Sequence, residues 1–300
     1  MAIGFNLSNK ISGAGTEVYI DNIQVILTEI RLKTSNIIPS ILPYNFRNGH
    51  AVIFNNELHI LGGTNDTGVT NSTNHYKWDG SVWTSVSTLP YGLESGTTVV
   101  YNNEIHILGG IGHATSHYKW NGSVWTSVST LPVNVFEGVA IVFNNELHIL
   151  YGTDHYKWNG SVWTSVSTLP YNFINHASAV VYNNELNILG GGTASSDIGY
   201  NHYKWNGTNW TQVSTLPYKL YYGSAVVINN EIHILGGADS GTDTNHYKWN
   251  GTNWIQLSNL PYSFRAGSGV VFNNKINILG GNGGYTSFYC LNALLVESMS

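Results

Sequence analysis

The stretch that decides the fold is ELHILGG at residues 57–63, followed by HYKWDG at 75–80 and SVWTSVSTLP at 81–90. The first piece alternates apolar and polar residues, as a half-buried strand does. Asp79-Gly80 suits a type I′ hairpin turn, and so does Asn55-Asn56 just upstream. With the apolar run before Asn55, the stretch predicts four short antiparallel strands.

The same order of events recurs along the chain. Each unit begins at a Leu-Pro pair, and the spacings between successive pairs lie between 38 and 47 residues. The units start at Leu42, Leu89, Leu131, Leu169, Leu216 and Leu260. Units of this length with four antiparallel strands are typical of propeller blades. We therefore predict an all-β, six-bladed propeller over residues 42–300.

The units resemble the kelch family, in which a glycine doublet precedes a tyrosine and a tryptophan that are separated by six residues. The doublets are Gly62-Gly63, Gly109-Gly110, Gly190-Gly191, Gly236-Gly237 and Gly280-Gly281, and the pairs are Tyr76/Trp83, Tyr118/Trp125, Tyr156/Trp163, Tyr203/Trp210 and Tyr247/Trp254. The resemblance covers residues 42 to about 292, although the third unit has Tyr151-Gly152 and the sixth has Val296 in place of the tryptophan. It implies that the tryptophans pack in the core. We expect the one of each Tyr/Trp pair between blades, and the one in HYKW within its blade.

Composition excludes several classes of function. Only 10% of the residues are charged, against about 25% in an average soluble domain. The net charge of −5 with 12 Lys and Arg argues against nucleic acid as a partner. No signal peptide is expected, because no basic segment and apolar run open the chain. No stretch is apolar enough to predict a membrane span.

Histidine is the residue type that most strongly raises the possibility of catalysis or metal binding. Nine of the 12 histidines occupy repeat positions on the second or third strand of a unit, namely His59, His75, His106, His117, His148, His155, His202, His233 and His246. Two neighbouring imidazoles are able to bind a metal, but Asn187 and Asn277 replace the histidine in two units. No third ligand recurs. We therefore expect hydrogen-bonded or stacked cross-strand pairs, and neither metal nor cofactor.

A binding function is favoured by the loops. Turns at one end of the blades are nearly uniform, either Asn-Asn or Asp-Gly/Asn-Gly, and we call this end the uniform face. Connections at the other end, the variable face, differ in length and chemistry, as binding loops on a rigid scaffold do. Their aromatic and charged residues suit a neutral glycan or a peptide, or alternatively fill the central channel. The candidate ligand-binding residues are Tyr44, Phe46, Arg47, Tyr91, Glu94, Phe136, Glu137, Phe173, Tyr221, Tyr222, Phe264 and Arg265.

Residues 1–41 lie outside the repeat. The sixth unit lacks a tryptophan-containing fourth strand after Cys290, and a propeller has to join its last blade to its first. We predict that an N-terminal strand from residues 17–35 completes the sixth blade. The remainder of 1–41 is expected to dock the propeller into a larger assembly.

The sequence thus predicts a non-enzymatic propeller that binds a glycan or protein ligand. SVWTSVSTLP is identical at 81–90, 123–132 and 161–170, which indicates recent duplication. Because recent duplication is common in fast-evolving surface proteins, we expect an adhesin-like or virion-associated protein, such as a phage decoration or attachment protein. Two alternatives stay open. They are an intracellular kelch scaffold for protein partners and a kelch-fold enzyme of sugar metabolism.

Overall fold

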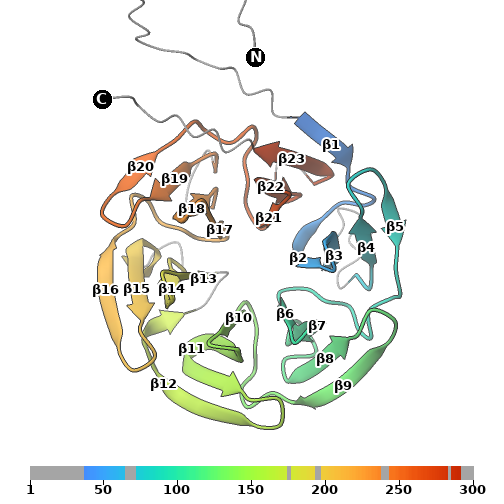
Figure 1. Cartoon of the computed structure of the whole chain (residues 1–300), viewed down its shortest axis with the longest axis horizontal. Coiled ribbons are helices and arrows are strands. Elements are labelled where there is room, and N and C mark those ends of the chain that lie inside the picture. The colour runs from blue at the N-terminus through green and yellow to red at the C-terminus, as the bar shows by residue number, and fades with distance from the viewer. Residues whose placement is uncertain are drawn as a thin grey trace, which may run out of the picture. The chain divides into compact units, whose positions relative to one another are not determined.

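The computed structural model describes residues 37–64, 72–173, 177–192, 197–237, 243–282 and 285–291. Within these ranges, six antiparallel sheets stand around a central channel, so the prediction of a six-bladed, all-β propeller is confirmed (Figure 1). A short 3-10 helix, Asp197–Tyr200, precedes β15. No helix in the described part of the chain is long and apolar enough to cross a membrane.

Each blade follows the chain outward from the channel. Blade 1 holds β2 (Arg47–Phe54), β3 (Glu57–Thr64), β4 (His75–Trp78) and β5 (Trp83–Ser85); blade 2 holds β6 (Thr97–Tyr101), β7 (Glu104–Leu108), β8 (Ser116–Trp120) and β9 (Trp125–Thr130); blade 3 holds β10 (Val139–Phe143), β11 (Glu146–Trp158) and β12 (Trp163–Phe173). Blade 4 holds β13 (Ser178–Tyr182), β14 (Glu185–Leu189), β15 (Asn201–Trp205) and β16 (Trp210–Thr215); blade 5 holds β17 (Ser224–Ile228), β18 (Glu231–Leu235), β19 (His246–Trp249) and β20 (Trp254–Gln256). Blade 6 holds β21 (Ser268–Phe272), β22 (Lys275–Leu279), β23 (Ser287–Leu291) and β1 (Ile37–Ile41).

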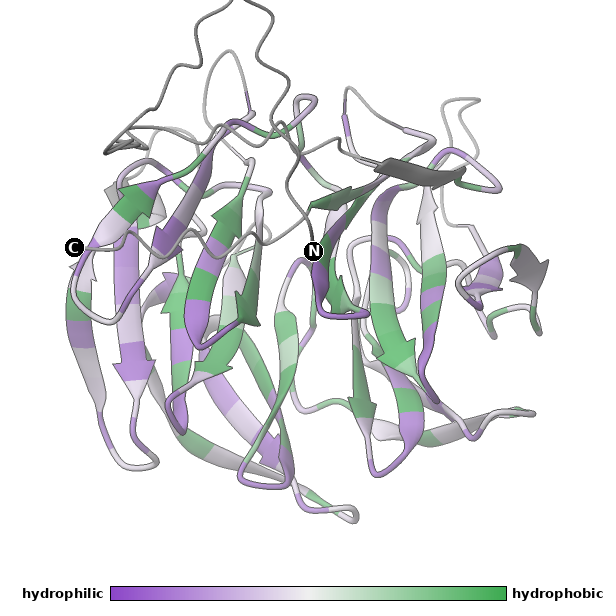
Figure 2. Ribbon diagram, turned by 45° about the horizontal axis from the view of Figure 1, so that its top comes forward, coloured by the Kyte–Doolittle hydropathy of each residue, from purple (hydrophilic) through white to green (hydrophobic). Residues whose placement is uncertain are grey.

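Burial is greatest in the second strand of each blade and least in the outermost strand. β3 is buried over nearly its whole length, whereas most residues of β16 are exposed or half-buried. Figure 2 shows apolar and polar bands along the strands of the blades. Apolar residues therefore face the neighbouring blades, and the Thr- and Ser-rich outer strands face solvent.

Blade 3 has its second and third strands in one continuous element. β11 runs for 13 residues, yet within it His148 Nδ1 lies only 2.7 Å from His155 Nε2. The strand must therefore fold back on itself, because seven residues of extended chain would span more than about 20 Å. The two-residue loop Thr153-Asp154 and Gly152, with φ 60°, allow this tight return.

The two kinds of turn on the uniform face differ in conformation. Asn55 and Asn56 have φ 49° and 60°, as a type I′ turn requires. At Asp79-Gly80 only the glycine has positive φ, so the type I′ prediction for that turn is wrong. Instead, Asp79 Oδ1 accepts hydrogen bonds from the backbone N–H groups of Ser81 and Val82, at 2.8 and 2.9 Å. The carboxylate shapes an Asx turn and removes the need for a second positive φ.

Tryptophans hold neighbouring blades together. Trp120 of blade 2 lies 5.4 Å from Phe54 and 4.9 Å from His75, both in blade 1, measured between ring centroids. The prediction that the HYKW tryptophan packs within its own blade is therefore wrong. The tryptophan of the Tyr/Trp pair also reaches the preceding blade, since Trp163 Nε1 donates to Ser129 Oγ at 3.2 Å.

The ring is closed by an N-terminal strand, but not by the predicted residues. β1 pairs antiparallel with β23, with Ile37 opposite Cys290 and Ile41 opposite Ser287. β1 thus takes the fourth position of blade 6 and displaces residues 17–35 from that role; residues 1–36 lie outside the described part of the chain. The physical reason is the repeat itself, because Leu42-Pro43 follows β1 just as Leu89-Pro90 follows the outer segment of blade 1.

Candidate functional site

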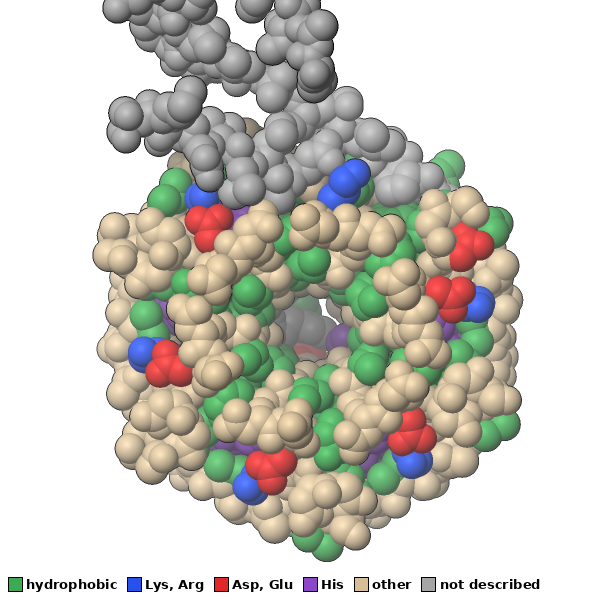
Figure 3. Space-filling model, viewed as in Figure 1, with side chains coloured by type: hydrophobic (Ala, Val, Ile, Leu, Met, Phe, Trp, Pro, Cys, Tyr) green, Lys and Arg blue, Asp and Glu red, His purple; other side chains and the backbone are tan. Residues whose placement is uncertain are grey.

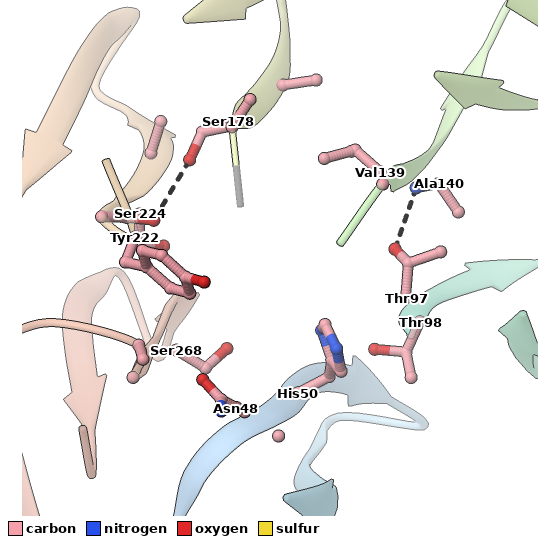
Figure 4. Close-up of a pocket in the computed structure, with 18 residues that line it drawn as sticks. Asn48, His50, Thr97, Thr98, Val139, Ala140, Ser178, Tyr222, Ser224 and Ser268 are labelled. Carbon is pink, nitrogen blue, oxygen red and sulfur yellow. Dashed lines mark hydrogen bonds between the residues drawn. The ribbon is translucent and has the colours of Figure 1, made fainter. Parts of the chain in front are cut away.

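A cavity of about 200 Å³ lies in the central channel, between the first strands of the six blades (Figure 4). Figure 3 looks along the channel from the uniform face, around which the Lys–Glu pairs are spaced. The lining side chains are mostly small, such as Gly49, Thr98, Ala140, Ser178 and Ser268. Small side chains on the innermost strands keep the channel open.

Some of these small side chains connect neighbouring blades. Thr97 Oγ1 accepts a hydrogen bond from the Ala140 N–H at 2.9 Å, and Ser268 Oγ accepts one from the Ala51 N–H at 3.0 Å. Asn48 Oδ1 and Thr98 Oγ1 are different, because they are buried and have no hydrogen-bond partner among the described residues. Buried polar atoms are normally satisfied. These two unsatisfied atoms belong to residues that line the channel cavity.

A ring of backbone hydrogen bonds surrounds the channel mouth on the variable face. In five blades, the residue just before a glycine near the start of the first strand has φ between 53° and 58°, at Asn48, Ser95, Glu137, Tyr222 and Ala266. Its N–H donates to the carbonyl of the equivalent residue in the preceding blade, at 2.8 Å from Asn48 to Ala266 and 2.7 Å from Glu137 to Ser95. The equivalent position of blade 4 lies outside the described residues. We call these five residues the mouth ring.

The mouth ring is a strained position. A non-glycine residue in the left-handed region costs roughly 1–2 kcal/mol, and glycine would adopt the same backbone with less strain. Five side chains of different chemistry nevertheless stand there. Strain of this kind concentrates at functional sites, so the mouth ring is the strongest structural indication of a site. Sequence reasoning missed its geometry because nothing in the residue types marks positive φ.

Four of the predicted residues meet at the mouth through aromatic and charged contacts. Tyr222 O–H donates to Glu137 Oε1 at 3.0 Å, from blade 5 to blade 3. The Arg265 guanidinium lies 4.9 Å from the Tyr221 ring and 5.1 Å from the Tyr222 ring. Burial, and then the Glu137 carboxylate, raise the pKa of Tyr222. The phenol therefore stays a protonated donor.

Two further predicted residues carry charges that are unpaired. Glu94 is 8% exposed, and its Oε2 has no hydrogen-bond partner in the described part of the chain. The same is true of the buried Nε of Arg47. By contrast, on the uniform face the five repeat lysines each lie 2.8–3.0 Å from a glutamate. Glu94 and Arg47 thus place polar atoms without a described partner near the variable face.

Three predicted binding residues belong to the core instead. Phe46, Phe173 and Phe264 are fully buried and pack between blades. Their rings are not accessible to a ligand, so their assignment to the site is corrected. The sequence does carry a signal for this burial, since the third residue after each Leu-Pro pair is always apolar (Phe46, Leu93, Val135, Phe173, Leu220 and Phe264). Phe136, at 39% exposure, remains on the surface.

Tyr44 and Tyr91 have a structural contact of their own. Tyr44 O–H donates to the Gly62 carbonyl at 2.9 Å, and Tyr91 O–H to the Gly109 carbonyl at 2.8 Å. The same bond recurs from Tyr171 to Gly190, Tyr218 to Gly236 and Tyr262 to Gly280. The first doublet glycine has to be glycine, because a Cβ at Gly62 would lie 2.2 Å from the Leu93 carbonyl oxygen. The tyrosine that follows five of the six Leu-Pro pairs therefore clamps the doublet.

The repeated histidines form hydrogen-bonded pairs, as predicted. Nδ1 of the second-strand ring lies 2.7–2.9 Å from Nε2 of the third-strand ring in the four pairs His59/His75, His106/His117, His148/His155 and His233/His246. In the described ranges, no group of three or more His, Cys, Asp or Glu side chains is placed to hold a metal ion. The paired nitrogens face one another and are occupied by that contact.

Comparison with solved structures supports the architecture. A structure titled "Structure of YjhT" matches with a TM-score of 0.69 at 16% sequence identity, over 84% of this chain and 95% of that one. At this identity the likeness shows the fold alone, and the fold is widespread, since 519 chains match. No family model and no curated protein matches the sequence. The chain is thus a six-bladed β-propeller whose likeness to kelch repeats remains a resemblance.

Proposed function

We propose that this propeller is a non-enzymatic binding protein whose ligand site is the channel mouth on the variable face. The observation that carries the proposal is the mouth ring, in which five different non-glycine side chains stand at strained positive φ above an open cavity. If the mouth ring had no ligand to bind, glycine at these five positions would make the propeller more stable. The strain is explained when the side chains serve recognition.

The chemistry of the mouth suits a neutral, polar ligand such as a glycan or a peptide segment. Tyr221 and Tyr222 offer ring faces and edges at low cost in rotamer entropy. Asn48 Oδ1 and Thr98 Oγ1 offer hydrogen-bond positions in the channel below. Arg47 and Glu94 add polar groups at the rim that are not paired with one another. Several weak contacts from different blades then add up around one axis.

Binding is favoured over catalysis because the repeated histidines have a structural role. Burial lowers the pKa of His59 to about 4 and that of His75 to about 3. A general base works best with a pKa near the operating pH, so these rings are poorly suited to that task at neutral pH. An adhesin-like or virion-associated setting is part of this proposal, and it rests on the near-identical repeats of the sequence.

The test is a binding screen with variants on both faces. Wild type is applied to glycan and peptide arrays, and any ligand found is titrated against Arg265→Ala and Glu94→Gln. The matched control on the uniform face is Asn103→Gly, which keeps the turn because Asn103 has φ 60°. We expect both mouth variants to bind at least about tenfold more weakly and the control to bind like wild type. Equal binding by the mouth variants, or no saturable ligand on either array, refutes the proposal.

A further inference from the structure

Blade 6 differs from blade 1 at four positions that share one face of its sheet. On the second strand, Lys275 and Asn277 stand where blade 1 has Glu57 and His59. On the third strand, Phe288 and Cys290 stand where blade 1 has His75 and Lys77. The register confirms the correspondence, because Asn277 lies opposite Cys290 just as His59 lies opposite Lys77.

These four departures meet in a second cavity of about 200 Å³, between blades 6 and 1. We call it the blade 6 pocket, and it is lined by Trp78, Gly80, Phe272, Asn273, Lys275, Asn277, Phe288 and Cys290. Elsewhere the equivalent place holds a Lys–Glu ion pair, such as Lys77–Glu57 at 2.9 Å. Cys290 is much shorter than lysine and leaves this space empty. The volume corresponds to roughly six water molecules.

Asn277 presents an unused acceptor in this pocket. Its Nδ2 donates to the carbonyls of Phe272 and Lys275 at 3.1 and 2.9 Å, so its Oδ1 points the other way. In blade 4 the equivalent Asn187 Oδ1 lies 3.1 Å from His202 Nε2. Phe288 replaces that histidine and has no donor.

The Asn277 side chain is held in place while its acceptor stays without a donor among the described residues. Asn277 is 3% exposed, and no described residue donates to its Oδ1. A ligand group with an N–H or O–H donor would give this acceptor its hydrogen bond.

Lys275 gives the pocket a positive charge. The five repeat lysines are each neutralised by a glutamate, but no described acid lies within ion-pair distance of Lys275. The walls opposite are aromatic, with the Trp78 and Phe288 rings 5.8 Å apart in an edge-to-face arrangement. Apolar walls with a few placed polar groups are typical of small-molecule sites.

We propose that the blade 6 pocket binds a small aromatic carboxylate that carries a hydroxyl group. The ring lies against Trp78 and Phe288, the carboxylate pairs with Lys275 Nζ, and the hydroxyl donates to Asn277 Oδ1. This site is independent of the channel mouth, because it opens on the uniform face beside the Asn273 and Gly80 turns.

Cys290 supplies the readout for a test with 4-hydroxybenzoate. It is the only cysteine of the chain and is partly exposed, so the rate of its alkylation by iodoacetamide reports on the occupancy of the pocket. Because burial raises the pKa of this thiol, the rate is measured at alkaline pH. We expect 4-hydroxybenzoate to slow alkylation saturably, by at least about fivefold. Benzoate and phenol each lack one polar group, and they should bind about tenfold more weakly.

Variants test whether the protection of Cys290 arises from binding in the blade 6 pocket. Lys275→Ala should abolish the protection, whereas Lys248→Ala, which breaks the ion pair of blade 5, should leave it intact. A K275E/C290K double variant rebuilds the ion pair of the other blades, and calorimetry should show no binding to it. The proposal is overturned if 4-hydroxybenzoate does not protect Cys290, if K275A is protected like wild type, or if the double variant still binds.

Discussion

His59 Nδ1 lies 2.8 Å from His75 Nε2, and both rings are buried where blade 1 meets Trp120 of blade 2. In blade 2 the contact extends further, because His117 Nδ1 lies 3.3 Å from Ser129 Oγ, which accepts from Trp163 Nε1 of blade 3. Since the tryptophan N–H is the donor there, the serine hydroxyl is free to donate to the imidazole. The histidines are therefore part of the joints between blades, in their neutral form.

This arrangement predicts a steep loss of stability in acid. Burial is the main reason why the folded pKa values of the nine repeat histidines are lowered from the usual 6.5 to about 3 or about 4. The unfolded state therefore binds more protons between these values, and stability present above about pH 6.5 is lost as the pH falls. Each histidine contributes roughly 1 kcal/mol per pH unit there. Urea unfolding at several pH values between 7.5 and 5 measures the slope, and a flat profile contradicts the prediction.

Blade 4 contains an altered form of the histidine pair and suggests a control. Blade 4 replaces the second-strand histidine with Asn187, whose Oδ1 lies 3.1 Å from His202 Nε2. His59→Asn should therefore keep a hydrogen bond to His75 and lose no more than about 1 kcal/mol at pH 7.5. The slope of unfolding free energy against pH should become shallower by the contribution of one histidine. An unchanged slope would mean that His59 titrates normally in the fold.

The mouth ring predicts opposite effects for two adjacent substitutions. Ala266 has φ 58°, so Ala266→Gly removes strain and should raise the free energy of unfolding by up to about 1 kcal/mol. Gly267→Ala should lower it by about 1–3 kcal/mol, because a Cβ there would lie 2.4 Å from the Phe264 ring and 2.7 Å from the Leu279 carbonyl oxygen. Denaturant titration of both variants measures these two changes in the free energy of unfolding. Destabilisation by Ala266→Gly would remove the strain argument for the site.

The tyrosine clamp predicts a stability effect without any ligand. Tyr262→Phe deletes the hydroxyl that donates to the Gly280 carbonyl at 2.9 Å and leaves that acceptor without the bond. We expect a loss of about 1–3 kcal/mol in the free energy of unfolding. The control is Tyr200→Phe, because Tyr200 is 37% exposed and its ring contact with Lys219 survives the change. Equal stability of Tyr262→Phe and wild type would show that the clamp contributes nothing.

The regular repeat makes the propeller architecture predictable from the sequence. The site is harder to predict, because it depends on the backbone conformation of individual loop residues. Leu42-Pro43 follows β1 as the other Leu-Pro pairs follow the outer segments, yet the sequence predicts the closing strand at residues 17–35. The variable loop around Phe46 predicts a surface position for it, although that position is apolar in every unit. The positive φ of Glu137 and Tyr222 depends on hydrogen bonds between blades, which residue types do not reveal.

Closure of the ring predicts that two N-terminal deletions differ. Deletion of residues 1–36 leaves β1 in place, so blade 6 keeps its fourth strand. Deletion of residues 1–41 removes that strand and leaves β23 as an unpaired edge, which also invites association between chains. We expect the longer deletion to melt at least about 10 °C lower than the shorter one, since a few kcal/mol of strand pairing and packing are lost. Calorimetry with size-exclusion chromatography measures both effects, and equal melting temperatures would show that β1 does not close the propeller.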